Sequence, residues 1–136
     1  MKQAISHWLS NIWLVFNSVV YLVLGYLFIF EFQMITSNLG IVPQSGSAAI
    51  ELMTVYGGLE LGLGLLFLIA LFVQKYRLFA QQLLVFSYLS FFLGRFAGIL
   101  SFDEASPITF YLFAFELIGF AISLLLLKMS GHKTDR

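Results

Sequence analysis

Apolar residues dominate this chain in four long runs, and short polar segments separate the runs. A helix that crosses a membrane needs about 20 predominantly apolar residues. Four stretches meet this condition, at about 12–30, 52–73, 78–100 and 108–127. Strict alternation of apolar and polar residues is absent, which disfavours a β-barrel. The pattern predicts an all-α protein, a bundle of four transmembrane helices that forms a single membrane domain over residues 1–136.

The lengths of the connections predict which spans are neighbours. Residues 74–77 and residues 101–106 are short connections, so the second, third and fourth spans are expected to lie next to one another. Ser106 followed by Pro107 favours a helix start, because Ser is a good helix cap and Pro suits the first helical position. The first external loop, about 31–51, contains Gly, Pro and several Ser, which predicts irregular backbone and favours a plain surface loop over a lid.

Composition excludes several classes of protein. Of the 136 residues, 60% are hydrophobic and only 10% are charged, too few to coat a water-soluble domain. Seven basic and seven acidic residues balance, so we expect the lipid bilayer as partner and no nucleic acid. The chain has no cysteine and no histidine within the four runs, and no phosphate-binding loop or carboxylate-rich cluster. We therefore expect no metal, no cofactor and no catalytic residues, and an enzymatic function is disfavoured.

Basic residues outside the runs predict the orientation. All six fall on one side of a four-span topology: Lys2, Lys75, Arg77, Lys128, Lys133 and Arg136. The opposite side carries no Lys or Arg, and holds the first external loop and the acidic residues Asp103 and Glu104. The positive-inside rule then predicts a multi-pass protein with both termini in the cytoplasm. Three aromatic residues are expected near the cytoplasmic interface: Trp8, Trp13 and Tyr76.

Three charged residues lie within the runs, Glu60, Arg95 and Glu116. Counted from the outer ends of their spans at 1.5 Å per residue, they lie about 9–13 Å deep. Charged residues inside a membrane usually face the interior of the protein and pair. We therefore predict a buried Glu–Arg–Glu polar site in the outer half of the bilayer, with Tyr56 beside Glu60 on the same side of its helix.

Polar and small residues at spacings of three, four and seven mark the interior sides of the spans. The sides so marked contain Asn17, Tyr21 and Gly25 in the first span, Met53, Tyr56, Gly57, Glu60 and Gly64 in the second, Arg95 beside Tyr88, Phe91 and Phe92 in the third, and Thr109, Glu116, Gly119 and Ser123 in the fourth. The remaining surface is rich in Phe and is expected to face lipid.

Two small-xxx-small pairs predict where helices pack closely. Gly58 and Gly62 form one pair, and Gly94 and Gly98 form the other. Such pairs let helix backbones approach one another, so we expect the second and third spans to meet there. The alternative is an interface between copies of the chain, as a homodimer or a larger assembly.

Three functions stay open for the three charged residues within the spans. The charges fix the packing of the helices in a structural or assembly subunit, because an unpaired charge in a membrane is costly. Alternatively, the two Glu and one Arg leave one negative charge, so that one Glu holds a proton or a cationic group completes the site. That arrangement suits a proton-coupled carrier or a binder of a small amphipathic ligand, and the carrier requires a dimer or larger assembly. A lipid- or quinone-linked membrane enzyme is the third alternative.

Several motifs resemble a known family. The segments Tyr56-Gly57-Gly58 and Gly94-Arg95-x-x-Gly98, followed by Glu116, are similar to those of small bacterial four-helix membrane proteins of unknown function. The resemblance implies a bacterial inner-membrane protein and no established reaction. Met53 stands where members of that family often carry an Arg. More remotely, the chain resembles the DoxX-like membrane proteins, some of which are linked to quinone or thiol redox. Direct thiol chemistry does not apply to a chain without cysteine.

Overall fold

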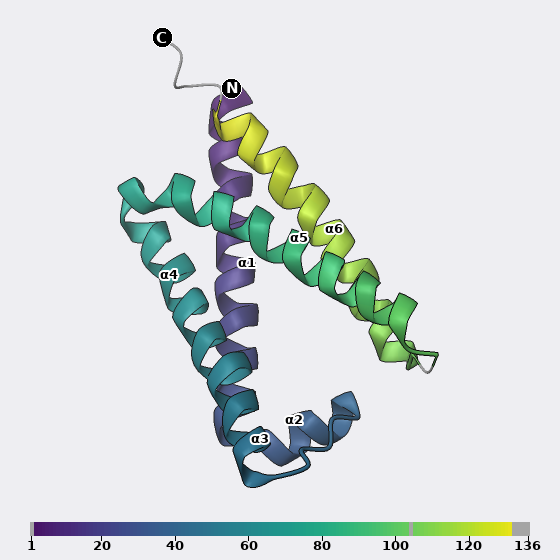
Figure 1. Cartoon of the computed structure of the whole chain (residues 1–136). Helices are drawn as coiled ribbons and strands as arrows, with labels where there is room; N and C mark the ends of the chain where they lie inside the picture. The colour runs from purple at the N-terminus through teal and green to yellow at the C-terminus, as the bar shows by residue number, and fades with distance from the viewer. Residues whose placement is uncertain (1, 104, 132–136) are drawn as a thin grey trace. The chain divides into compact units, whose positions relative to one another are not determined.

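The computed structural model describes residues 2–103 and 105–131, and all its regular elements are helical (Figure 1). In chain order they are α1 (Lys2–Phe30), α2 (Phe32–Leu39), α3 (Gly46–Leu52), the π-helix η1 (Met53–Leu59), α4 (Glu60–Phe72), the 3₁₀ turn η2 (Gln74–Tyr76), α5 (Arg77–Ser101) and α6 (Pro107–Gly131). The prediction of an all-α protein is confirmed. Of the residues with a predicted role, Glu104, Lys133 and Arg136 lie outside the described part.

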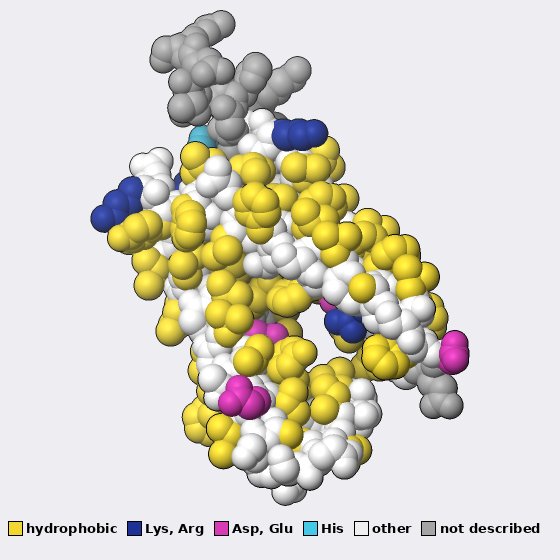
Figure 2. All heavy atoms as spheres, in the orientation of Figure 1, with side chains coloured by type: hydrophobic (Ala, Val, Ile, Leu, Met, Phe, Trp, Pro, Cys, Tyr) yellow, Lys and Arg dark blue, Asp and Glu magenta, His cyan; other side chains and the backbone are white. Residues whose placement is uncertain are grey.

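Four helical stretches are long and apolar enough to cross a membrane, as predicted: Ser6–Phe30, Gly46–Phe72, Gln74–Ser101 and Pro107–Met129. The first three begin four to six residues before the predicted apolar runs, because polar residues such as Ser10 and Asn11 continue the helix. The fourth exceeds its run by one residue at the start and two at the end. Hydrophobic side chains cover much of the visible surface in Figure 2. The protein is therefore a multi-pass membrane protein.

The first external loop is more regular than its composition predicts, and the expectation of irregular backbone over 31–51 is wrong. Only residues 40–45 separate α2 from α3. α2 forms because Phe32, Ile35 and Leu39 recur at helical spacing, and it ends at Gly40, whose φ of 70° is left-handed. α3 begins after Ser45, whose hydroxyl accepts a hydrogen bond from the Ala48 N–H at 3.2 Å.

The chain forms two compact units. Unit 1 contains α1 up to Trp13 together with α5 and α6, and unit 2 runs from Leu14 through α4 to Gln74. α1 is a continuous helix that contributes to both units. The single domain over 1–136, and the adjacency of the second and third spans, stay predictions.

Unit 2 packs the second part of α1 against η1 and α4 at small residues. The Ser18 hydroxyl donates a 2.9 Å hydrogen bond to the Gly64 carbonyl, and the Tyr21 ring meets the Phe67 ring edge to face at 5.3 Å. A Cβ added to Gly25 would lie 2.7 Å from the backbone nitrogen of Leu61. The glycine therefore permits backbone-to-backbone contact of the two helices.

Unit 1 is built on α5 and α6, which pack side by side as their short connection predicts (Figure 1). α6 starts at Pro107, as predicted, and the Thr109 N–H bonds the Ser106 carbonyl at 2.9 Å. The Tyr88 ring lies directly against Gly119, where an added Cβ would be 2.6 Å from ring atoms Cδ1 and Cζ. This contact holds α5 and α6 in register one turn away from Glu116.

Candidate functional site

Arg95 and Glu116 form an ion pair between α5 and α6. The Arg95 Nε–H donates to both carboxylate oxygens, at 3.0 Å to Oε1 and 2.9 Å to Oε2. Nη2 donates to Oε1 at 2.6 Å. The sequence predicts that these two residues lie at similar depth on neighbouring spans, and the structure brings them together. Charge-assisted hydrogen bonds of this kind fix the plane of the guanidinium as well as its position.

The two partners of the pair differ in exposure. The Glu116 side chain is 7% exposed, whereas the Arg95 side chain is 29% exposed. The carboxylate therefore lies in the interior of unit 1, and the guanidinium reaches from the surface of α5 to meet it. Since the charges cancel, the pair by itself is neutral, which lowers the cost of holding it inside a membrane.

One edge of the Arg95 guanidinium is open. A guanidinium has five N–H donors, and Glu116 engages the edge formed by Nε and Nη2. No residue in the described ranges 2–103 and 105–131 accepts a hydrogen bond from Nη1. Donors without a partner are costly away from water. The open edge is therefore the part of the pair available to a further group.

Glu60 and Tyr56, the other two predicted site residues, belong to unit 2. Glu60 is the first residue of α4, and its Oε2 is buried without a hydrogen-bond partner among the described residues. Tyr56 lies in η1, and its ring stacks on Phe28 at 5.1 Å. The site made of Glu60, Arg95, Glu116 and Tyr56 stays a prediction, because its members are divided between the two units.

The four glycines predicted to mediate packing have free space around them. A Cβ added at Gly58, Gly62, Gly94 or Gly98 would meet nothing within 4 Å. The close contacts within the units occur at other glycines instead: Gly25, Gly57, Gly64 and Gly119. The small-xxx-small pattern identifies positions where a close approach is sterically allowed, and it does not identify the partner. A role of the four glycines in a further interface stays a prediction.

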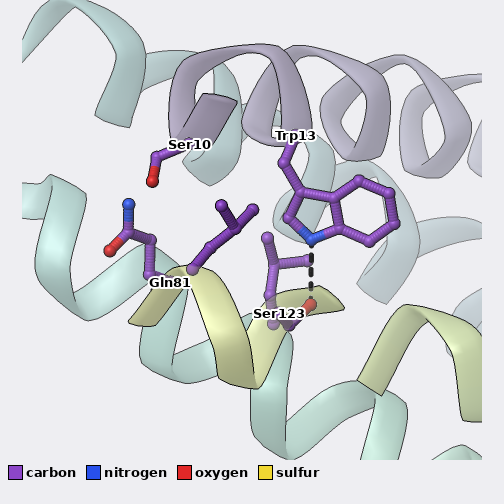
Figure 3. Close-up of a pocket in the computed structure, with 6 residues that line it drawn as sticks. Ser10, Trp13, Gln81 and Ser123 are labelled. Carbon is purple, nitrogen blue, oxygen red and sulfur yellow. Dashed lines mark hydrogen bonds between the residues drawn. The ribbon is translucent and has the colours of Figure 1, made fainter. Parts of the chain in front are cut away.

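A polar cluster in unit 1 was not predicted as a site (Figure 3). The Trp13 indole N–H donates a 2.9 Å hydrogen bond to the Ser123 hydroxyl, although the sequence suggests only an interfacial role for Trp13. Ser10 and Gln81 lie beside this bond, and Gln81 Oε1 is buried without a partner among the described residues. In the sequence, this cluster shows only as polar residues within apolar spans, Gln81 in the third and Ser123 in the fourth. Neither residue type indicates which side chain it contacts.

The pocket lined by this cluster is narrow. No part of the space between its lining atoms admits a sphere the size of a water molecule. Leu84 and Leu126 supply its apolar walls. An internal water needs both room and several polar partners. The pocket is therefore a tightly packed polar contact between α1, α5 and α6.

Replacing Trp13 with Phe is expected to lower the free energy of unfolding by about 1 kcal/mol. Phe keeps an aromatic ring, although a smaller one, and the buried Ser123 hydroxyl loses the indole donor. Trp8→Phe is the matched control, because Trp8 is 64% exposed, and it is expected to change stability by less than about 0.5 kcal/mol. Unfolding in mixed micelles measures both variants, and equal losses would contradict the assignment.

A comparison with known protein families identifies the family of this chain. Residues 9–127 match a family described as a domain of unknown function, DUF4345. No curated protein and no solved structure matches the chain. The family match covers all four apolar runs and every predicted site residue, from Tyr56 to Glu116. The chain therefore belongs to the DUF4345 family of domains of unknown function.

Proposed function

We propose that this membrane protein binds a proton or the cationic head of a small amphipathic ligand at a polar site within the bilayer. Glu60, Arg95 and Glu116 form the site, with Tyr56 beside Glu60. The observation that carries the proposal is the Arg95–Glu116 ion pair. The pair neutralises the Glu116 carboxylate, and the Glu60 carboxylate has no share in it. The single uncompensated negative charge then belongs to Glu60, whose Oε2 has no partner among the described residues.

The inclusion of Glu60 in the proposed site rests on the charges and on the predicted depths of the residues along their spans. Arg95 has donors that no described residue accepts, and Glu60 has an acceptor that no described residue uses. Their depths along the spans, about 9 and 12 Å from the outer ends, predict a single layer. Two carboxylates and one guanidinium together carry one negative charge. A proton or an organic cation restores neutrality, and one displaces the other.

The place of the site follows from the predicted orientation. We propose the bacterial inner membrane, with the basic connections in the cytoplasm and the polar site in the outer half of the bilayer. Four short spans enclose little space, so a carrier function requires a homodimer or a larger assembly. A binding function alone requires only one chain.

A structural role is the second candidate, and the tight packing of unit 1 favours it. The pocket between α1, α5 and α6 does not admit a water-sized sphere. In that case the Arg95–Glu116 pair fixes the register of α5 against α6, and the protein serves as a subunit of a membrane complex. The two functions differ in one measurable property, which is whether Glu60 exchanges a proton.

Infrared spectroscopy of the carboxyl groups tests the proposal. Near neutral pH we expect a protonated-carboxyl band that Glu60→Gln removes. Glu116→Gln should remove it too, because the charge of Arg95 then balances that of Glu60 alone. Adding the cationic amphiphile dodecyltrimethylammonium should abolish the band and release a proton, whereas the uncharged dodecyl maltoside should not. A band that persists in Glu60→Gln, or the absence of any such band in the wild type, would overturn the proposal and favour the structural role.

A further inference from the structure

Glu60 lies where its helix packs on α1, within unit 2. A Cβ added to Gly57 would lie 2.6 Å from the Ile29 side chain, and one added to Gly64 would lie 2.8 Å from the backbone nitrogen of Leu22. Glu60 follows Gly57 by three residues and precedes Gly64 by four, so it shares a helix side with both contacts. The Glu60 Oε2 atom is buried and accepts no hydrogen bond from the described residues.

Two aromatic pairs connect this helix to α1, one on each side of Glu60. Tyr56, four residues before Glu60, stacks on Phe28 with ring centroids 5.1 Å apart. Phe67, seven residues after Glu60, meets Tyr21 edge to face at 5.3 Å. Spacings of four and seven return to the same side of a helix, so both rings lie on the side that carries Glu60. The carboxylate is therefore flanked by aromatic rings along the line of contact with α1.

Tyr56 is the ring of this group that a ligand can reach. It is 42% exposed, whereas Phe28, Tyr21 and Phe67 are buried. The faces of aromatic rings carry negative charge and attract cations within about 6 Å of the ring centre. Residues four apart on a helix have Cβ atoms about 5–6 Å apart, so a cation that pairs with Glu60 can also contact the Tyr56 ring.

The number of hydrogen-bond donors on the head group decides which cations fit this place. A primary ammonium has three N–H groups, and each needs an acceptor when the group leaves water. The three groups point in different directions, so one carboxylate accepts from at most two of them. A quaternary ammonium has no N–H group, and its methyl groups pack well on aromatic faces. Glu60 and Tyr56 together therefore satisfy a quaternary head group, whereas a primary one keeps at least one donor that Glu60 does not accept.

We propose that the site at Glu60 selects quaternary ammonium head groups over primary ones, and that Tyr56 determines this selectivity. The inference rests on the proposed function, because it names the class of cation that displaces the proton from Glu60. Glu60 supplies the opposite charge, the Tyr56 ring contacts the methyl groups, and the hydrocarbon chain of the ligand stays among the lipids. The tyrosine of the Tyr56-Gly57-Gly58 motif thereby has a role in binding.

A comparison of two cationic amphiphiles tests the selectivity. Dodecyltrimethylammonium and dodecylammonium have the same hydrocarbon chain and one positive charge near neutral pH, and they differ only in the head group. Infrared spectroscopy in mixed micelles measures the concentration of each that removes half of the Glu60 carboxyl band. The wild type is compared with Tyr56→Leu, Tyr56→Phe and Tyr26→Leu. Tyr26 is the matched control, because it is 50% exposed in the same unit and its ring contacts Phe30 of its own helix at 5.0 Å.

We expect the wild type, Tyr56→Phe and Tyr26→Leu to respond to the quaternary amphiphile at a concentration about tenfold lower than to the primary one. Tyr56→Leu should reduce this ratio several-fold, because the carboxylate remains and the ring is lost. Equal concentrations in the wild type, an unchanged ratio in Tyr56→Leu or an equal fall in Tyr26→Leu would overturn the selectivity. In these cases the band still responds to a cation, so the proposed function stands. A band that neither amphiphile removes would contradict the cation site itself, and the selectivity with it.

Discussion

Arg95→Ala is expected to lower the free energy of unfolding by about 3–5 kcal/mol. The substitution removes the partner that gives three hydrogen bonds to Glu116, and the Glu116 side chain is 7% exposed. An uncompensated carboxylate in the interior of a membrane helix pair has no water to solvate it. Reversible unfolding of the protein in mixed micelles, followed by circular dichroism, measures the loss.

Removing both charges is the control for this prediction. Arg95→Met combined with Glu116→Leu should recover most of the loss, since apolar residues of similar volume replace a buried ion pair at little cost. A double variant as unstable as Arg95→Ala would show that the Arg95 side chain stabilises the protein through its packing. A loss below about 1 kcal/mol in Arg95→Ala would show that the pair contributes as little as an exposed ion pair does.

Gly25→Ala is expected to have the second largest effect, a net loss of about 2 kcal/mol of unfolding free energy. The new Cβ would lie 2.7 Å from the Leu61 backbone nitrogen and 2.9 Å from the Gly57 carbonyl oxygen. Backbone atoms cannot turn aside as a side chain does, so α1 has to move away from η1 and α4. We expect an overpacking cost of about 3 kcal/mol. The better helix propensity of Ala offsets about 1 kcal/mol of it.

Gly62→Ala is the matched control, because it makes the same chemical change in the same unit with nothing within 4 Å. We expect a gain of up to about 1 kcal/mol in unfolding free energy, from helix propensity alone. The same unfolding assay measures both variants, and the two effects should have opposite sign. A loss in Gly62→Ala as large as that in Gly25→Ala would place Gly62 in a close interface, as its small-xxx-small pattern predicts.

Helical periodicity was sufficient to predict much of the interior. The spacing assigns Asn17, Tyr21, Tyr88, Glu116 and Ser123 to interior sides, and all five are buried. The reason is that a membrane helix shows lipid an apolar surface, so polar and small residues gather on the side that packs. Tyr56 and Phe91 are assigned to interior sides in the same way, but each is 42% exposed. The contact of Arg95 with Glu116 followed from depth and from the short connection between their spans.

Details that depend on the partner surface were not predictable. The π-helix η1 has the same apolar composition as an α-helix, and its hydrogen-bond pattern is set by packing on α1. The eight-residue α2 is shorter than the window that hydropathy needs, and Gly, Pro and Ser beyond it obscure the pattern. The bond from Trp13 to Ser123 joins residues 110 positions apart, and neither residue type identifies the other in advance.

The order of synthesis gives the Arg95–Glu116 pair a further consequence. Arg95 precedes Glu116 by 21 residues, so the ribosome completes the third span before the partner of its charge exists. At about 5–20 residues per second, the interval lasts about one to four seconds. A lone Arg at the centre of a membrane helix costs about 2.5–3.5 kcal/mol on insertion scales, and Arg95, which lies about 9 Å from the outer end of its span, carries part of that cost. We therefore expect α5 to become more stable in the membrane once α6 has followed it. The residues of unit 2, by contrast, have all been synthesised once Gln74 is made.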